Sequence, residues 1–296
     1  MQTTYDAATA SERLHTLAEG PVWDDARQQL LWVDIPAGQV LEGRLIDEHV
    51  EVTGCHTLPH TVGAVVPAID GGLLVAGQNS LLTITPGRDE VRHGPAVLPP
   101  DVNSRLNDGA CDPAGRFLVG SLALDDRVGE EALYRLDLDG SVEVVADGLT
   151  LSNGLGWSAD GRTLYHVDSV PGVVWSIDYD IETGRLGTRQ VFIDGSRGTP
   201  DGLCLDVEGN LWIAFWGAGE VRCFSTQARP LATVRVPAPN TSSVAFVGAH
   251  RDRLLITTAR KDLSPAQLQA YPDSGRLFLA DVHTCGPATP VWGGST

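Results

Sequence analysis

Four polar residues recur at one position of a repeated pattern, and their side chains carry the oxygen atoms that cations bind. Glu19, Asn107, Asn153 and Asp201 each lie 10 or 11 residues before a short apolar run, with a glycine one or two residues further on. Oxygen ligands that converge at one point suit a hard divalent cation, and no histidine or cysteine shares this position. The pattern predicts a metal site at Glu19, Asn153 and Asp201, with Ca²⁺, Mg²⁺ or Mn²⁺ favoured over a structural Zn²⁺.

Each of these residues also has an ordinary structural explanation. Asn-Gly and Asp-Gly are common turn dipeptides, so a turn accounts for any one of them alone. A turn does not account for the position that they share in the repeat. Arg105 precedes Asn107 by two residues, the period of a strand, so both side chains face one way and together could hold substrate oxygens. An ion pair between Arg105 and a surface carboxylate is the alternative.

Three further residues are candidates for the surroundings of this site. His60 lies close to the equivalent position of the second repeat, and Trp216 follows the fifth apolar run, so both could line a pocket wall. The alternatives are a solvated loop histidine and a tryptophan of the core. Asp108 is either a support for its neighbours or a turn residue. The sequence contains no G-x-S-x-G nucleophile elbow and no glycine-rich phosphate loop.

The apolar runs define the elements that must position these residues. Successive runs begin 43, 44, 47, 47 and 43 residues apart, and turn-forming residues precede each run. Short strands at this period are typical of a β-propeller with four strands in each blade. We therefore predict an all-β, six-bladed β-propeller that forms one domain over residues 1–296, against the alternative of a β-sandwich with accidental spacing. The runs are 30–33, 73–76, 117–120, 164–167, 211–214 and 254–257.

One short helix is predicted over 263–271, with Ser264 as its N-cap and Pro265 at the first helical position. The remainder of the chain shows almost no helical periodicity.

Charge and composition exclude several classes of partner. The chain of 296 residues has 21 basic and 38 acidic residues, and a formal charge of −17 argues against nucleic acid and anionic membranes as partners. No run approaches 18 apolar residues and residues 1–17 form no leader, so we expect a cytoplasmic protein without a membrane partner. The five cysteines are odd in number and form no C-x-x-C pair, as expected of reduced thiols. Lys261 is the only lysine, and the oligomeric state, monomer or dimer, stays open.

Longer segments around these residues resemble the family of senescence marker protein (regucalcin), gluconolactonase and luciferin-regenerating enzyme. The resemblance spans nearly the whole chain in the right order. It implies a six-bladed propeller with one divalent metal at the mouth of its channel, and hydrolysis of sugar lactones to aldonic acids. The matching segments are AEGPVW (18–23), RLNDG (105–109), DPAGR (112–116), LSNGLGWS (151–158), PDGLCLD (200–206), GNLW (209–212) and TTAR (257–260).

The resemblance also implies residue roles. Glu19, Asn153 and Asp201 would be the metal ligands, Asp201 would also be the catalytic acid/base, and Arg105 and Asn107 would contact the substrate. Ca²⁺ is the expected metal, with Mn²⁺, Mg²⁺, Zn²⁺ or Fe²⁺ as alternatives, and a small sugar lactone is the expected partner. Whether Asp201 or a metal-bound hydroxide takes the proton from the attacking water stays open.

The sequence departs from the family pattern at Leu124, where regucalcin-like members carry a glutamate. The missing carboxylate leaves the choice of sugar open, and Leu124 is a candidate for the pocket wall. The residues just before the acidic loop 125–131 could form the edge of a lid, whereas the conformation and the role of the loop itself stay open. Three rival functions remain. They are a phosphotriesterase-like metallohydrolase, a non-catalytic calcium-binding regulatory propeller and a protein-interaction scaffold. The converging carboxylates disfavour the scaffold, because a scaffold needs no charged axis.

Overall fold

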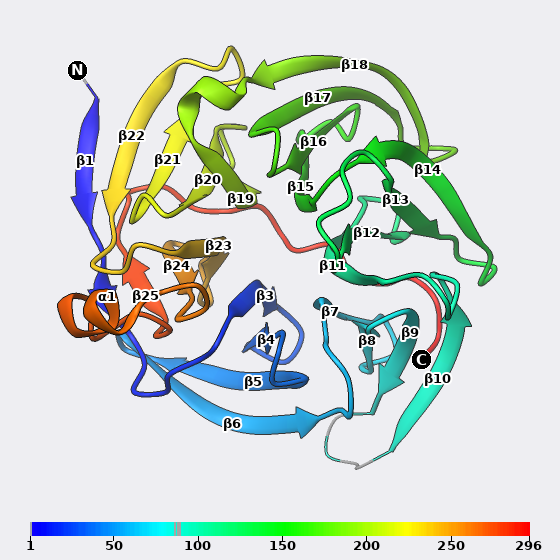
Figure 1. Ribbon diagram of the computed structural model, residues 1–296, viewed down its shortest axis with the longest axis horizontal. Coiled ribbons are helices and arrows are strands. Elements are labelled where there is room, and N and C mark those ends of the chain that lie inside the picture. Colours follow the sequence, from blue (N-terminus) through cyan, green and yellow to red (C-terminus); the bar gives the residue numbers. More distant parts are fainter. Residues whose placement is uncertain (1, 86, 88–89) are drawn as a thin grey trace.

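Six sheets surround a central axis in the computed structural model, which describes residues 2–85, 87 and 90–296 (Figure 1). Each sheet is one blade, and its innermost strand lies next to the axis. The predicted six-bladed, all-β propeller is therefore confirmed. The repeated apolar runs are the second strands of successive blades, which are buried on both faces and for that reason read as continuous apolar sequence.

The blades follow one another along the chain. Blade 1 has β3 (Ala18–Asp24), β4 (Gln29–Asp34), β5 (Gln39–Ile46) and β6 (His49–Thr57), and blade 2 has β7 (Ala64–Pro67), β8 (Leu73–Ala76), β9 (Ser80–Ile84) and β10 (Val91–Ala96). Blade 3 has β11 (Ser104–Cys111), β12 (Phe117–Ala123), β13 (Glu131–Leu136) and β14 (Val142–Leu149), and blade 4 has β15 (Ser152–Trp157), β16 (Thr163–Asp168), β17 (Val173–Asp180) and β18 (Arg185–Ile193). After the short 3₁₀ helix η1 (Gly195–Arg197), blade 5 has β19 (Thr199–Leu205), β20 (Leu211–Trp216), β21 (Glu220–Phe224) and β22 (Pro230–Arg235). Blade 6 has β23 (Thr241–Val247), β24 (Arg253–Thr258) and β25 (Phe278–Ala280).

Two N-terminal strands close the ring. β2 (Ala8–Thr9) pairs antiparallel with β25 and becomes the outermost strand of blade 6, and β1 (Thr3–Asp6) lies parallel to β22 as a fifth strand of blade 5. Blade 6 therefore combines strands from both ends of the sequence. This arrangement ties the N-terminal segment, which leads into blade 1, to the last blade.

Apolar side chains form a separate core between each pair of neighbouring blades. Leu31 of blade 1 packs with Val65 of blade 2, for example, and Leu118 of blade 3 packs with Leu164 of blade 4. Six such clusters surround the axis, so the axis itself does not have to supply the hydrophobic core. Polar side chains can therefore line the channel.

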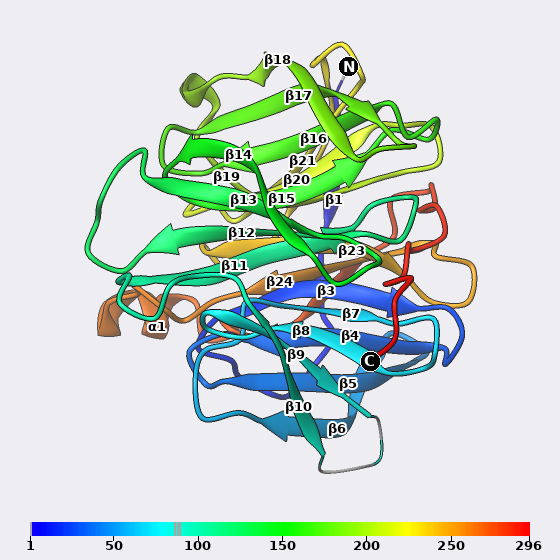
Figure 2. The same ribbon diagram turned by 90° about the vertical axis from the view of Figure 1, so that its right-hand side faces the viewer.

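Different segments cover the two faces of the ring. The connection from β12 to β13 and the helix α1 (Pro265–Ala270) project from one face, and the C-terminal segment crosses the opposite face (Figure 2). The helix lies within the predicted range, and Ser264 forms a capping box with Gln267 at its start. In the described part of the chain, no helix has the length and apolar character that crossing a bilayer requires.

Candidate metal and substrate site

The innermost strands place their polar residues at β-bulges. Strands β3, β11, β15 and β19 each shift register at one point, where two of their residues stand opposite one residue of the second strand. Asn107, Asn153 and Asp201 lie within these bulges, and Glu19 lies directly before one. A bulge bends its strand and redirects the side chain, which turns these residues towards the axis. The shared position in the sequence repeat is thus a shared backbone irregularity.

Glycines within the bulges let neighbouring innermost strands approach one another. A Cβ atom at Gly154 would lie 2.7 Å from the backbone oxygen of Asp201 and 2.7 Å from the backbone nitrogen of Leu203, closer than real Cβ contacts allow. A Cβ atom at Gly202 would likewise clash with the side chain of Ser243. Glycine follows the polar residue because blade 4 meets blade 5, and blade 5 meets blade 6, at these points.

The polar residues line one cavity of about 390 Å³ at the mouth of the channel. Its walls include the four side chains selected by the repeat together with Arg105, and Trp216 forms part of the rim. The volume is within the range of small-molecule sites, which is about 300–1,000 Å³. The cavity opens on the face that carries α1 and the β12–β13 connection, because Lys261 and Arg127 also line it.

A chain of hydrogen bonds fixes the two asparagines. Arg105 Nη1 donates to Asn107 Oδ1 at 2.8 Å, and Asn107 Nδ2 donates to Asn153 Oδ1 at 2.7 Å. Asn153 Nδ2 donates to Ser169 Oγ at 2.7 Å, and Ser169 Oγ donates to the carbonyl of Pro200 at 2.7 Å. The chain runs from blade 3 through blade 4 to blade 5. It sets the orientation of the Asn153 amide and leaves a second lone pair on its oxygen available to a ligand.

Two carboxylates lie buried beside a single guanidinium. Glu19 and Asp201 are each 6 % exposed and Arg105 is 9 % exposed. Burial raises the pKa of both carboxyl groups well above their usual range; the charge of Asp201 raises that of Glu19 further, and the charge of Asp108 raises both. Burial also lowers the pKa of Arg105 to about 10, an effect that the two carboxylates oppose. One positive charge thus faces an excess of negative charge in a poorly solvated site.

The donor set fits a divalent cation. Asp201 Oδ1 is buried and has no hydrogen-bond partner among the described residues, which is costly for a carboxylate oxygen unless a ligand satisfies it. Glu19, Asp201 and the Asn153 carbonyl supply two negative charges and a neutral oxygen. The described residues contain no group of three His, Cys, Asp or Glu side chains placed to hold a metal, so a cation at this point would need an amide oxygen in addition to the carboxylates.

Asp108 lies on the same bulge as Asn107 and is partly buried. It accepts a hydrogen bond from the backbone N–H of Gly109 at 2.8 Å, and burial raises its pKa to about 6. Its charge acts on both Glu19 and Asp201. The sequence left two interpretations of Asp108 open, a support for its neighbours or a turn residue. Its burial beside Glu19 and Asp201 favours the first.

Two aspartates that the sequence reasoning missed hold the backbone two to three residues before Glu19 and Asn153. Asp34 accepts hydrogen bonds from the backbone N–H groups of residues 16 and 17 at 3.0 and 3.1 Å, two residues before Glu19. Asp168 does the same for residues 150 and 151 before Asn153. Both aspartates end the second strand of their blade. Each aspartate directly follows an apolar run of the repeat, so the sequence contained a signal by which both could have been found.

The connection between β12 and β13 is held by Arg127. Its guanidinium donates to Asp125 at 2.7 Å, to Glu130 at 3.3 Å and to Ser104 Oγ at 2.9 Å. This network fixes Arg127, Asp126 and Val128 at the rim of the cavity. The loop 125–131, whose conformation the sequence left open, therefore lies beside the mouth.

Two residues proposed for the pocket wall lie elsewhere. His60 is exposed in the connection before β7 and is not among the residues that line the cavity. Leu124 is 51 % exposed and also lies outside the lining, whereas its neighbours Leu122 and Ala123 are part of it. The strand ends at Ala123, so Leu124 lies outside it, at the start of the connection to β13.

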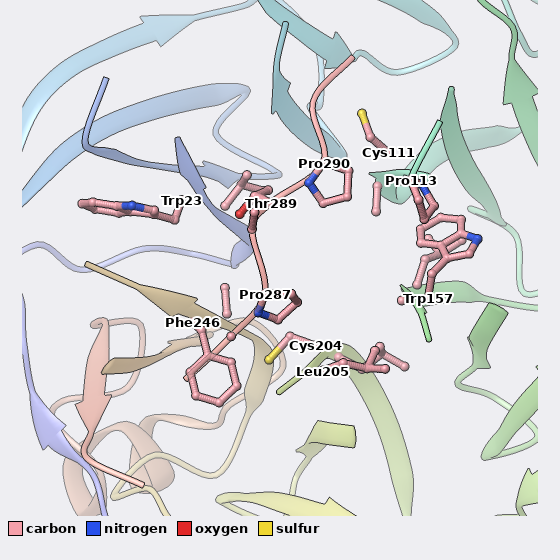
Figure 3. Close-up of a pocket in the computed structure, with 18 of the residues that line it drawn as sticks. Trp23, Cys111, Pro113, Trp157, Cys204, Leu205, Phe246, Pro287, Thr289 and Pro290 are labelled. Atoms are coloured by element: carbon pink, nitrogen blue, oxygen red, sulfur yellow. The ribbon is translucent and has the colours of Figure 1, made fainter. Parts of the chain in front are cut away.

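A second cavity of about 310 Å³ occupies the other end of the channel (Figure 3). Its walls are mainly apolar, with Trp23, Trp157 and Phe246 among them, and Pro287 and Pro290 of the C-terminal segment lie across it. It lacks the converging oxygen atoms of the first cavity. The buried carboxylates and the guanidinium lie at the opposite mouth.

Comparisons with known proteins find similar sequences and similar structures. Residues 17–260 match the family model described as SMP-30/Gluconolactonase/LRE-like region. The regucalcin of Danio rerio is 35 % identical over 267 residues, which cover 88 % of this chain and 89 % of that protein. A crystal structure of a calcium-binding protein, regucalcin, from Agrobacterium tumefaciens str. C58 has a TM-score of 0.91 at 28 % identity, with 99 % of each chain covered. The structure of a luciferin-regenerating enzyme has a TM-score of 0.89 at 26 % identity and covers 97 % of this chain and 99 % of its own.

Proposed function

This chain belongs to the SMP-30/gluconolactonase/LRE-like family, and from that premise we propose that it is a metal-dependent hydrolase that opens sugar lactones to aldonic acids. The observation that carries the proposal is the buried pair Glu19 and Asp201, with an unpartnered oxygen on Asp201, beside the guanidinium of Arg105. Such an arrangement is costly for stability and suits a cation and an oxygen-rich substrate.

Glu19, Asn153 and Asp201 would hold the cation, and their hard oxygen donors favour Ca²⁺, with Mn²⁺ and Mg²⁺ as alternatives. When bound, the cation supplies Lewis acidity to the lactone carbonyl. Its charge also favours the ionised forms of Glu19 and Asp201, whose pKa values are raised in the protein alone.

The side chains of this protein provide the remaining functions. Within the described residues, no protein group accepts a hydrogen bond from Nε or Nη2 of Arg105, so these N–H groups can donate to substrate oxygens. Asn107 holds Arg105 and Asn153 in place. Asp201 would act as the general base that takes the proton of the attacking water, because one of its oxygens can bind the cation while the other accepts the proton.

A lactone panel measured with and without divalent metal tests the proposal. We expect ring opening of at least one aldonolactone by the Ca²⁺- or Mn²⁺-loaded protein, followed as release of acid, and no turnover after chelation. Hydrolysis of a phosphotriester but of no lactone would favour the phosphotriesterase-like alternative. Tight Ca²⁺ binding without hydrolysis of either class would favour the regulatory propeller.

A further inference from the structure

We propose that Lys261 binds an acidic substituent of the substrate, so that the preferred lactones are those of sugar diacids, with a carboxylate at the end remote from the reacting carbonyl. This inference rests on the proposed lactonase function and names its substrate class. Lys261 lines the same cavity as Glu19 and Asp201 and is the only lysine of the chain.

The backbone around Lys261 is fixed although its side chain reaches solvent. Its N–H donates to the carbonyl of Thr16 at 2.9 Å, and its carbonyl accepts from Asn240 Nδ2 at 2.8 Å. The next residue, Asp262, has a φ of 64°, a left-handed conformation that few residues other than glycine adopt. Aspartate adopts it more readily than most residues, so the turn directly after Lys261 is well defined without marked strain.

Lys261 is the cation at the mouth whose donors are least occupied. Arg127 is committed to Asp125, Glu130 and Ser104, and Arg105 lies deep beside the carboxylate pair. Lys261 Nζ has one partner, Asp262, at 2.6 Å, and the two side chains are 46 % and 60 % exposed. An ion pair this exposed contributes little to stability, so a substrate carboxylate can replace Asp262 at small cost.

The position of Lys261 fits the far end of a substrate. It follows β24 in blade 6, across the ring from blade 3, which carries Arg105 (Figure 1). A lactone whose carbonyl lies at the carboxylate pair would extend its terminal carbon towards the rim. Lysine offers three donors on a flexible stem, which suits a carboxylate that approaches from solvent.

The test compares two γ-lactones that differ only at the terminal carbon, one from a hexonic acid (CH₂OH) and one from the matching hexaric acid (COO⁻). The readout is the ratio of kcat/KM for the acidic lactone to that for the neutral one. Loss of a charge-assisted hydrogen bond at this exposed position should lower the ratio about tenfold in Lys261→Met. Asp262→Asn should raise it, because asparagine tolerates the left-handed φ and no longer competes for Lys261.

Arg235→Met is the matched control for net charge, because Arg235 forms an exposed ion pair with Asp6 on the outer edge of blade 5. It should leave the ratio unchanged. An equal loss on both lactones in Lys261→Met, or a ratio that Arg235→Met lowers as much, would overturn the proposal.

Binding of the open-chain acids separates this inference from the proposed reaction. Calorimetry on the Ca²⁺-loaded protein should show the hexarate binding about tenfold more tightly than the hexonate, with the difference absent in Lys261→Met. Hexarate should also slow acetylation of Lys261, which peptide mass spectrometry reads directly because the chain has no other lysine. If neither lactone is opened, the proposed reaction fails, while these two measurements still decide the role of Lys261. Equal affinity for the two acids in the wild type would refute that role.

Discussion

Replacing Asp201 by asparagine should make the metal-free protein more stable and the enzyme nearly inactive. Asp201 and Glu19 are buried and both act on the charge of Arg105, and Asp201 Oδ1 has no partner among the described residues to lose. Each pKa unit by which burial raises a carboxyl of the folded protein costs about 1.4 kcal/mol of folding stability at a pH where the unfolded carboxyl is ionised. Removing one of the two buried carboxyls should therefore raise the free energy of unfolding by at least about 1 kcal/mol, which for a chain of this size is a rise in Tm of about 2 °C or more, measured by calorimetry in excess chelator.

The same variant should lose turnover even when it is saturated with metal. Asparagine keeps an oxygen ligand but not the base, and removal of a general base slows a reaction by about 10²–10⁴-fold. We therefore expect kcat on a reactive lactone to fall at least about 100-fold, with metal occupancy checked independently. Turnover within about threefold of the wild type, set against that range, would leave Asp201 as a ligand only.

Asp206→Asn is the matched control for the change in stability. Asp206 is as buried as Asp201 and follows the same strand, β19, but it accepts hydrogen bonds from two backbone N–H groups, from Asn210 Nδ2 and from Trp212 Nε1. An amide cannot accept all of these, so the variant should lose about 1–3 kcal/mol. If Asp201→Asn is destabilised in the same way, the electrostatic account of the site is wrong.

The structure supports three further predictions. Chelation should abolish turnover but leave the circular dichroism spectrum nearly unchanged, because the six cores lie between the blades and away from the site; loss of the sheet signal would contradict this. Asn153→Ala should weaken metal affinity measured by calorimetry by about tenfold, since it removes a ligand and leaves Asn107 Nδ2 with one fewer acceptor; unchanged affinity would place the metal elsewhere. In the metal-free protein, the stability advantage of Asp201→Asn should grow as pH rises from 4 to 8. The unfolded Asp and Glu carboxyls ionise near about 3.9 and 4.3, whereas the folded Glu19 and Asp201 retain protons to higher pH, so folding stability is lost over that range. Urea titrations of both proteins at several pH values would show a constant difference if this reasoning failed.

The repeat made the fold and the centre of the site predictable for one physical reason. Buried second strands are continuously apolar, so their spacing counts the blades. The bulges of the innermost strands require a glycine and redirect the neighbouring polar side chain, so the motif marks the axis. The strands β1 and β2 gave no comparable signal. They are short and pair with strands more than 200 residues away, and such pairing leaves no local pattern.

The rim of the cavity was less predictable because connections, rather than repeated strands, form it. His60 was expected near the mouth from its distance to a repeat position, and Leu124 from the family resemblance, but β12 ends before Leu124 and β7 begins after His60. Once the chain leaves a strand, the alternation of side chains no longer tells which way a residue faces. Lys261 was named in the sequence only as the single lysine, and its place at the mouth follows from backbone hydrogen bonds to residues 16 and 240.

The division of the molecule into blades and axis explains how it tolerates such a site. In a protein with one central core, two buried carboxylates that share one guanidinium would lie where most of the stability is produced. Here the apolar clusters lie between blades, and aspartates such as Asp34 and Asp168 hold the strand starts through backbone N–H groups. The electrostatic cost of Glu19 and Asp201 is therefore confined to the channel mouth. A cation that binds there relieves this cost without any change in the packing of the blades.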